Sequence, residues 1–387
     1  MNSVILISKF SPQALSFLKS TREKGISTIF VWIGSENEPK PSSSYIGEIY
    51  KFPAKNLYKQ KGIDLILKIA ERNKHSCIIT TNDYISRWVY NCLDFKKLSC
   101  ELLFSKNIKN INSKQKQNQA ALDSGLNVLE TFYINKDKDI YSNIPEKFFP
   151  LCLRPSDPGT ILPGFKVKII RNYKALESFV ESFEKIDSFL IAQPFMDLPN
   201  MVVHGSRDMN GNIFGLESFI VKRKFEGLTL TISPFKIDST IMSSCFKFVE
   251  KMDIYGPFHF EFLYETEKKN AWFLEINNRM GGTTAKVFSL GYDEPGYILR
   301  AMGMDVEIKR KISSQTASSK ISLIKYLIYT LKHRLSPLDY PYNESLKNKI
   351  FFILKGLFCF KDDIFSLKDF KSIFSFYKTI VYEKLKR

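Results

Sequence analysis

The first hundred residues alternate short apolar runs with a helical pattern. Residues 4–7 form a run rich in β-branched side chains, residues 12–24 carry apolar side chains at helical spacing, and residues 27–32 form a second apolar run. The order strand, helix, strand predicts a βαβ unit. Together with a third apolar run at 76–80, this pattern predicts that residues 1–104 form a small doubly wound α/β domain.

Polar residues follow the third apolar run, where a parallel strand would end. Ligands of open α/β sheets bind at the carboxyl ends of the strands, so Asp83 is interpreted either as a ligand-facing side chain or as an ordinary helix cap. The region lacks Gly-x-Gly-x-x-Gly, which leaves a dinucleotide site with little support.

From about residue 105 the pattern becomes a mixture of helices and strands. Residues 114–124 have a helical pattern that ends at Gly125, and residues 149–153 and 189–193 are predicted strands. Residues 201–221 contain Asn-Gly between two apolar stretches, which is typical of a β-hairpin. The sequence therefore predicts α+β architecture for this part of the chain.

Two alternating segments between residues 259 and 276 are predicted to be neighbouring strands joined by a turn. Glu261 and Glu275 would then converge from facing strands, with Asn277 pointing to the same face two residues further on. Carboxylate and amide oxygens are hard ligands that suit Mg²⁺. A solvated hairpin face that carries an ion pair is the alternative.

The charge of the chain favours anionic partners. The formal net charge is +17 and the pI is near 9.4, although a Lys-rich genome composition explains the excess equally well. Six scattered cysteines without a Cys-x-x-Cys pair argue against zinc, and His204 and His259 are interpreted as structural histidines of strands. No nucleic-acid-binding module is recognisable, and the amino terminus does not have the pattern of a signal peptide, so a cytoplasmic protein is predicted.

Around the two glutamates the chain resembles the ATP-grasp superfamily, in the carboxylate–amine ligase branch that includes biotin carboxylase and the large subunit of carbamoyl phosphate synthetase. The family pattern Glu-Phe followed by Phe-x-Glu-x-Asn-x-Arg stands here as Glu-Phe and then Phe-Leu-Glu-Ile-Asn-Asn-Arg, which ends at Arg279. The resemblance implies that Glu261 and Glu275 bridge Mg²⁺ or Mn²⁺ to the phosphates of ATP. It also implies that Asn277 assists them and that Arg279 stabilises an acyl phosphate.

The same resemblance divides the chain into domains. It implies an ATP-grasp domain at 105–305, with a small lobe at about 105–192, a hinge at about 193–196 and a large lobe at about 197–305. The final region, 306–387, is predicted to be basic and mainly helical.

Two cations resemble the phosphate contacts of the small lobe. Lys114 looks like the lysine that opens this lobe, and Arg154 stands where the family usually has the lysine of a Lys-Pro strand end. Arginine keeps the charge of that lysine and changes the geometry of its donors.

The hinge and the lid depart from the family pattern. Gln193 and the backbone near Phe195 are implied to meet the adenine, and Met196 to pack on it, whereas Pro194 stands where an acidic residue is usual. The lid at 156–165 contains two glycines and two prolines in place of a Gly- and Ser-rich loop, so a stiffer lid is predicted.

The residues after Arg279 suggest an acceptor site. Gly281 and Gly282 permit close approach of the backbone to a ligand, and such a pair lines the substrate site in amino acid ligases of the superfamily. A plain turn into the next helix is an equal alternative. Arg223 is a weaker candidate for binding an anionic substrate.

The predicted function is an ATP-dependent ligase that activates a carboxylate as an acyl phosphate and joins it to an amine. One alternative is an ATP-dependent carboxylase that uses bicarbonate. The other is a non-catalytic ATP-binding scaffold protein with a degenerate ATP-grasp active site. The predicted partners are ATP, a small carboxylate and an amine, with a homodimer as a further option.

The carboxyl-terminal segments at 321–387 mix lysine with isoleucine, phenylalanine and tyrosine. This composition suggests a surface that makes peripheral contact with an anionic membrane. Ordinary core helices with lysine on their solvated faces are the favoured alternative.

Overall fold

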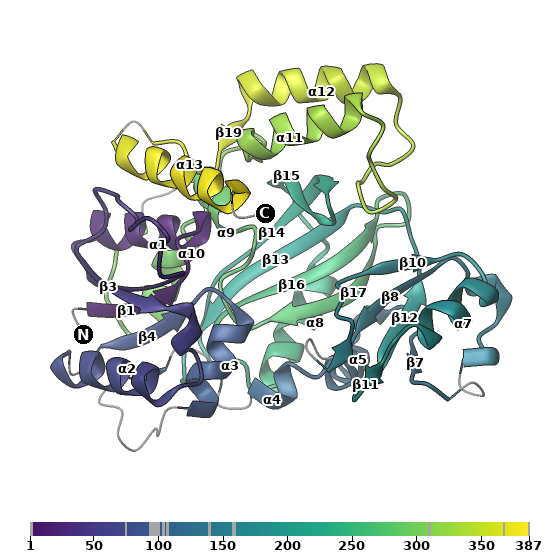
Figure 1. The fold of residues 1–387 in the computed structure, drawn as a ribbon, viewed down its shortest axis with the longest axis horizontal. Coiled ribbons are helices and arrows are strands. Elements are labelled where there is room, and N and C mark those ends of the chain that lie inside the picture. Colours follow the sequence, from purple (N-terminus) through teal and green to yellow (C-terminus); the bar gives the residue numbers. More distant parts are fainter. Residues whose placement is uncertain are drawn as a thin grey trace.

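A computed structural model describes residues 3–73, 76–92, 101–102, 105, 108–137, 141–156, 160–308, 311–366 and 368–385. Within these residues the chain forms an N-terminal α/β domain, a small lobe, a large sheet and a group of C-terminal helices (Figure 1). Residues 157–159 of the predicted lid lie outside the described residues.

The N-terminal domain is a parallel sheet with helices on both faces. Its elements are β1 (Ser3–Ser8), α1 (Pro12–Glu23), β2 (Ser27–Gly34), β3 (Glu48–Pro53), the 3-10 helix η1 (Ala54–Asn56), α2 (Gln60–Arg72), β4 (Cys77–Thr80), α3 (Asp83–Cys92) and β5 (Glu101–Leu102). The strand order is β3-β2-β1-β4-β5. Val4 and Leu6 pack in the hydrophobic cluster that contains α1, whereas Ile5 and Ile7 pack with α2 and α3. Alternation along β1 thus supplies both faces of the predicted doubly wound sheet.

The small lobe is built around an antiparallel sheet in the order β10-β8-β12-β7. The elements of this part of the chain are α4 (Ile108–Ile111), α5 (Lys114–Asp123), β6 (Asn127–Val128), β7 (Phe132–Ile134), η2 (Glu146–Phe148), β8 (Leu151–Pro155), β9 (Ile161–Leu162), β10 (Lys168–Ile170), α7 (Tyr173–Glu181), β11 (Lys185–Ile186) and β12 (Leu190–Pro194). Leu176 and Val180 of α7 bury one stripe of the helix against the sheet. Strand β9, within the predicted lid, pairs with β11.

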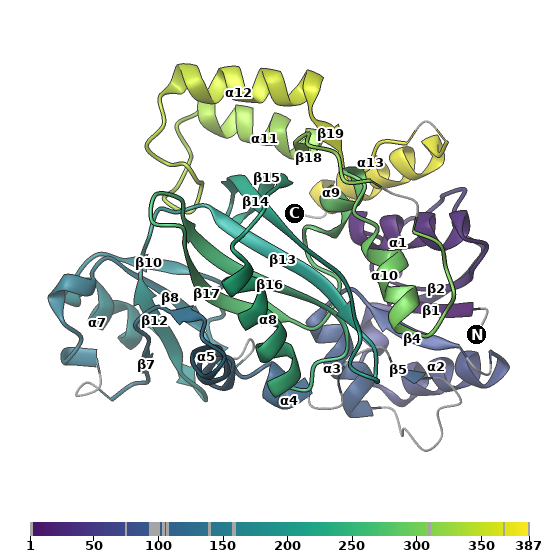
Figure 2. The same cartoon turned by 180° about the vertical axis from the view of Figure 1, so that it is seen from behind.

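The large lobe forms most of an eight-stranded sheet in the order β19-β18-β15-β14-β13-β16-β17-β6 (Figure 2). Its own elements are β13 (Asn200–Arg207), β14 (Ile213–Phe225), β15 (Leu228–Pro234), α8 (Ser239–Lys251), β16 (Gly256–Glu265), β17 (Asn270–Asn277), α9 (Thr284–Ser289) and α10 (Glu294–Ala301). Helix α8 packs on one face through Phe248, and α9 packs on the other through Val287. The two-lobed α+β architecture predicted for this region is present.

The C-terminal region contributes to the same sheet. Its elements are β18 (Ala317–Ser318), α11 (Lys320–Leu331), α12 (Leu346–Cys359), β19 (Lys361–Asp362) and α13 (Phe370–Leu385). The three helices match the predicted helical character, but β18 and β19 were not predicted, and they extend the large sheet beyond β15. Among the described residues, no helix is long and apolar enough to cross a membrane.

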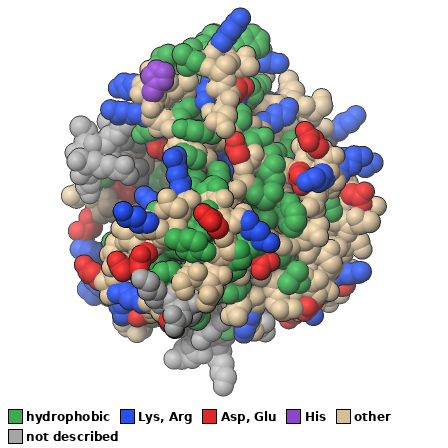
Figure 3. All heavy atoms as spheres, turned by 90° about the vertical axis from the view of Figure 1, so that its right-hand side faces the viewer, with side chains coloured by type: hydrophobic (Ala, Val, Ile, Leu, Met, Phe, Trp, Pro, Cys, Tyr) green, Lys and Arg blue, Asp and Glu red, His purple; other side chains and the backbone are tan. Residues whose placement is uncertain are grey.

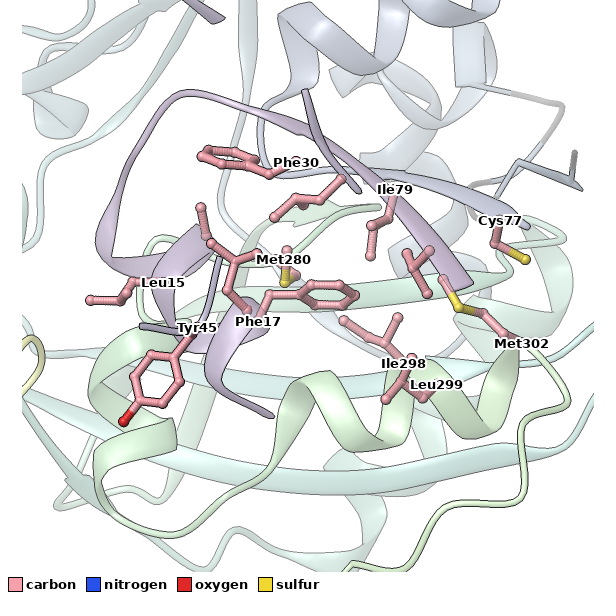
Figure 4. Close-up of a cluster of buried hydrophobic side chains, with 14 of the residues drawn as sticks. Leu15, Phe17, Phe30, Tyr45, Cys77, Ile79, Met280, Ile298, Leu299 and Met302 are labelled. Carbon is pink, nitrogen blue, oxygen red and sulfur yellow. The ribbon is translucent and has the colours of Figure 1, made fainter. Parts of the chain in front are cut away.

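A hydrophobic cluster joins the N-terminal domain to the large lobe (Figure 4). Phe17 and Phe30 of the N-terminal domain pack with Met280, Ile298 and Leu299 of the large lobe, and all five side chains are buried. Because Met280 directly follows the last residue of the sequence motif, this packing anchors that segment between two domains.

Candidate active site

The β16–β17 hairpin brings the two glutamates of the motif together. Glu261 lies directly opposite Glu275, and His259 lies opposite Asn277. Residues opposite each other in an antiparallel pair share one face of the sheet, so these four polar side chains form one cluster. A bulge follows Glu261, and beyond it Phe262 packs in the core on the other face.

Two cations reach Glu275 from the small-lobe part of the chain. Lys114, the first residue of α5, places Nζ 2.5 Å from Oε2 of Glu275, and Arg154 of β8 places Nη1 3.5 Å from the same oxygen. Burial disfavours the ionised carboxylate, but the charges of Lys114 and Arg154 outweigh it, so the pKa of Glu275 lies below its usual value. The sequence predicted both cations near one site, and the structure brings them together.

Arg154 is held by two further contacts. Its Nη2 donates to Oε1 of Gln193 and to the carbonyl of Leu274, both at 3.1 Å. Gln193 in turn donates from Nε2 to Oγ1 of Thr131 at 2.9 Å. The side chain of Gln193 therefore orients Arg154 in this structure, whereas the sequence predicted that it meets an adenine.

The other predicted hinge residues lie at the end of β12. The backbone N–H of Phe195 donates to the carbonyl of Pro150 at 2.8 Å, so it is already engaged. Pro194, Phe195 and Met196 are half-buried. An adenine bound here would have to hydrogen-bond to hinge groups other than the N–H of Phe195.

Asn277 and His259 form a hydrogen-bonded row beside the glutamates. Nδ2 of Asn277 lies 3.0 Å from Oε1 of Glu275 and 3.2 Å from Nε2 of His259. With the amide donating, Nε2 of His259 accepts, and its Nδ1 carries the proton toward the carbonyl of Arg279 at 3.3 Å. This arrangement leaves the amide oxygen of Asn277 as the atom able to ligate a cation.

Arg279 pairs with a carboxylate of the N-terminal domain. Its Nε lies 2.7 Å from Oδ2 of Asp83, and Nη1 donates to the carbonyl of Met280 at 3.0 Å. Burial opposes the charge of Arg279, but Asp83 stabilises it strongly, so the pKa of Arg279 is raised. Oδ1 of Asn82 accepts from the N–H of Tyr84 at 2.8 Å, so Asn82 supplies the helix cap and Asp83 faces the cluster.

The predicted acceptor segment rests on two histidines. The rings of His204 and His259 stack with their centroids 5.6 Å apart, and a Cβ on Gly281 would lie 3.0 Å from His204 and 3.1 Å from His259. Only glycine fits that approach without displacing a ring. A Cβ on Gly282 would meet no atom within 4 Å.

A buried glutamate that sequence reasoning missed completes this group. Glu294 is fully buried, and its Oε2 lies 3.2 Å from Nδ1 of His204, whose Nε2 lies 2.8 Å from Oγ1 of Thr283. Burial opposes its ionisation, but the neighbouring His204 outweighs it, and the pKa of Glu294 is lowered. Its position at the start of α10 is ordinary for glutamate, so nothing in the sequence marked it.

Arg223 lies outside this cluster. It is 3% exposed, its Nη1 and Nη2 lie 2.5 and 2.8 Å from the carboxylate of Glu344, and its guanidinium stacks 3.9 Å from the ring centroid of Phe352. The carboxylate of Glu344 and the stacked ring of Phe352 give this arginine a packing role between β14 and the C-terminal region. It is therefore not carried into the proposed substrate site.

The donor set suits a magnesium ion shared with phosphates. Glu261, Glu275 and the amide oxygen of Asn277 are hard oxygen donors on one face of the hairpin. Among the described residues, no group of three or more His, Cys, Asp or Glu is arranged to hold a metal by itself. Mg²⁺ commonly uses one or two carboxylates together with water and substrate phosphate, so two glutamates and an amide are sufficient.

Comparison with solved structures identifies the fold. An N5-carboxyaminoimidazole synthetase from Staphylococcus aureus complexed with ADP has a TM-score of 0.59 at 15% identity and covers 81% of this chain and 80% of its own. The biotin carboxylase–β-γ-ATP complex from Campylobacter jejuni gives 0.61 at 16%, covering 81% and 74%, and an L-amino acid ligase from Bacillus licheniformis gives 0.58 at 14%, covering 81% and 78%. No family model and no curated protein sequence matches the chain.

These structures share the ATP-grasp fold of carboxylate–amine ligases, and this chain has the same fold. The predicted fold class is thereby confirmed. The structures of similar fold include both a biotin carboxylase and an L-amino acid ligase, so the fold alone does not choose the reaction.

Proposed function

We propose that the chain is a magnesium-dependent ligase that uses ATP to activate a carboxylate as an acyl phosphate and joins it to an amine, with ADP and phosphate released. The observation that carries the proposal is the pairing of Glu261 with Glu275 beneath Lys114, Arg154 and Arg279. Carboxylates to hold a divalent cation and three cations to hold phosphate are the groups that phosphoryl transfer requires.

The mechanism follows from the charges of the cluster. Lys114 and Arg154 share the carboxylate of Glu275, so both already point to the place where phosphate oxygens would lie. Glu261, Glu275 and Asn277 would hold Mg²⁺ or Mn²⁺, which supplies neutralisation of the phosphate charge. Phosphoryl transfer needs positioning and charge stabilisation more than a protein nucleophile, and this cluster offers both.

Arg279 acts at the acceptor end of the proposed site. Its guanidinium, oriented by Asp83, would stabilise the negative charge of the acyl phosphate. Gly281 and Gly282 follow it, and the open space beside Gly282 leaves room for a small carboxylate or amino acid.

The experiment is an ADP-release assay across pairs of carboxylates and amines. ADP release is expected only with Mg²⁺ and a matching acid, and Glu275→Ala is expected to abolish it. Glu265→Ala is the matched control. Glu265 ends β16, the strand that pairs with the strand of Glu275, and its Oε1 lies 2.7 Å from Nζ of Lys268 rather than in the cluster. Full turnover by Glu275→Ala would show that the metal assignment is wrong.

Two alternatives are separated by the same assay. Bicarbonate-dependent ADP release without an amine would favour the carboxylase, a reading motivated by the fold shared with biotin carboxylase. Tight ATP binding without turnover across the whole panel would favour a non-catalytic scaffold, which the unusual hinge at Pro194 motivates.

The proposal extends to assembly and place of action. A homodimer is proposed because one structure of similar fold is described as a biotin carboxylase domain dimer, and light scattering of the purified chain tests it. The protein is proposed to work in the cytoplasm, with peripheral contact between residues 321–387 and the anionic inner face of a membrane. The basic composition of that region supports the contact.

A further inference from the structure

Exposed hydrophobic side chains are concentrated in the C-terminal region. In the part of the chain that the structure describes, more than half of the large hydrophobic residues that are exposed lie between residues 324 and 377. Scattered single residues of this kind are normal on a protein surface, but a concentration in one region marks an interaction surface.

These side chains follow the outward faces of three helices. Helix α12 exposes three of them one turn apart, with Phe351 68% and Phe358 83% exposed, while Ile353 on its inner side is fully buried. Helices α11 and α13 repeat the pattern. The outer faces, together called the apolar face here, comprise Ile324, Ile328, Leu331, Phe351, Leu354, Phe358, Phe370, Phe374 and Tyr377.

This arrangement differs from that of an ordinary surface helix. A helix on a soluble domain buries its apolar stripe and presents polar residues to water. Here α12 buries Ile353 against Leu323 and Tyr326 of α11, and it still carries a second apolar stripe outward. Core packing therefore does not explain Phe351 and Phe358.

The charged side chains that α11 and α12 themselves carry have one sign. Neither α11 nor α12 contains an acidic residue, and Lys347 and Lys355 are exposed on the same side of α12 as Phe351 and Phe358. A second copy of the same face would bring these lysines against their own counterparts, which disfavours self-association. An anionic partner with an apolar interior complements both features.

Helices α11 and α12 lie together at one end of the molecule. Figures 1 and 2 place them beyond β15 with α12 outermost, whereas α13 lies beside the N-terminal domain. Figure 3 shows hydrophobic and basic side chains together at this upper end. A flat anionic surface could thus meet α11 and α12 at once.

We infer that the apolar face lies on an anionic lipid bilayer. Phe351, Leu354 and Phe358 enter the boundary between headgroups and acyl chains, and Lys347 and Lys355 contact lipid phosphates. Interfacial amphipathic helices bind by this combination of buried apolar area and attraction to anionic lipid. The inference rests on the membrane contact named in the proposed function and identifies its surface, and it does not depend on the ligase chemistry.

The test is flotation of the full chain with vesicles of phosphatidylcholine, with and without phosphatidylglycerol. Binding is expected to require phosphatidylglycerol and to weaken as salt is raised. The double variant Phe351→Ser, Phe358→Ser is expected to bind at least roughly tenfold more weakly. The matched control is Leu122→Ser, Met209→Ser, which removes hydrophobic side chains that are 55% and 61% exposed elsewhere, and it should bind as the parent chain does.

Several outcomes overturn the inference. The bilayer assignment is wrong if the parent chain does not float with phosphatidylglycerol vesicles at low salt, or if the double phenylalanine variant floats equally well. If that variant instead converts a dimer to a monomer in light scattering while flotation is unchanged, the face is an interface between copies. Unchanged circular dichroism and thermal midpoint confirm that the exposed substitutions preserve the fold, and ADP release reports separately on the ligase proposal.

Discussion

Replacing Glu275 with glutamine keeps the shape of the side chain and removes the charge that two cations share. Lys114 lies 2.5 Å and Arg154 3.5 Å from the same carboxylate oxygen, and the three side chains are only 17 to 22% exposed. At an effective dielectric constant of about 20, the gross attraction is about 7 kcal/mol for the Lys114 pair and about 5 kcal/mol for the Arg154 pair. Desolvation cancels most of this attraction, so we expect a net loss of about 1–3 kcal/mol in the free energy of unfolding.

The sign of the pH dependence is fixed by the lowered pKa of Glu275. Burial raises that pKa, but the neighbouring charges lower it below the ordinary value of 4.5. The ion pairs therefore contribute their full stability above the unfolded-state pKa, and this contribution is lost as the pH falls through the lower folded-state pKa. The difference between the parent chain and Glu275→Gln should be constant near neutral pH and should shrink in acid.

The measurement is thermal unfolding of both chains across a pH series, read at matched ionic strength. We expect the thermal midpoint of Glu275→Gln to be lower than that of the parent chain at neutral pH. The two midpoints should converge in acid. Equal midpoints at neutral pH, or a difference that grows on acidification, would refute the proposed electrostatic linkage. Adding ATP without Mg²⁺ provides a second check, because phosphates should stabilise the variant by pairing with Lys114 and Arg154.

Three further substitutions test other parts of the site. Gly281→Ala should reduce turnover at least roughly tenfold while nucleotide affinity measured by calorimetry is unchanged, since the added Cβ meets two histidine rings at 3.0 to 3.1 Å. Asp83→Asn should lower kcat by roughly tenfold and raise the KM for the acid, because Arg279 loses its charged partner; unchanged steady-state kinetics would contradict that role. Arg223→Ala should destabilise the chain by about 3–5 kcal/mol in chemical denaturation, yet leave ATP affinity per folded molecule unchanged, because it leaves Glu344 unpaired.

The local pattern was sufficient to predict the hairpin of the site. Alternation along two adjacent strands predicted that Glu261 and Glu275 would face each other, and the register shows them opposite. Strands β1, β2 and β4 and helix α1 of the N-terminal domain also followed from short-range periodicity, whereas β3 and α2 were not predicted. These features depend on residues close together in the chain.

Contacts between distant segments were beyond the reach of the sequence. The pairing of Arg279 with Asp83 depends on how two domains dock, and the burial of Glu294 depends on His204 from a separate strand. Neither relation leaves a periodic signal in either partner. The two-residue strands β18 and β19 are likewise too short to show alternation, so the region appeared helical throughout.

The large sheet also acts as a fixed spacer between two surfaces. Strands β18 and β19 connect the C-terminal helices to one edge of the sheet, and the β16–β17 hairpin carries the glutamates near the other edge. Neighbouring strands lie about 4.8 Å apart, so the four steps from β18 to β16 span roughly 20 Å. With α11 and α12 resting on a bilayer, a membrane-borne substrate would have to present its reacting carboxylate or amine on an extended headgroup, well clear of the acyl chains.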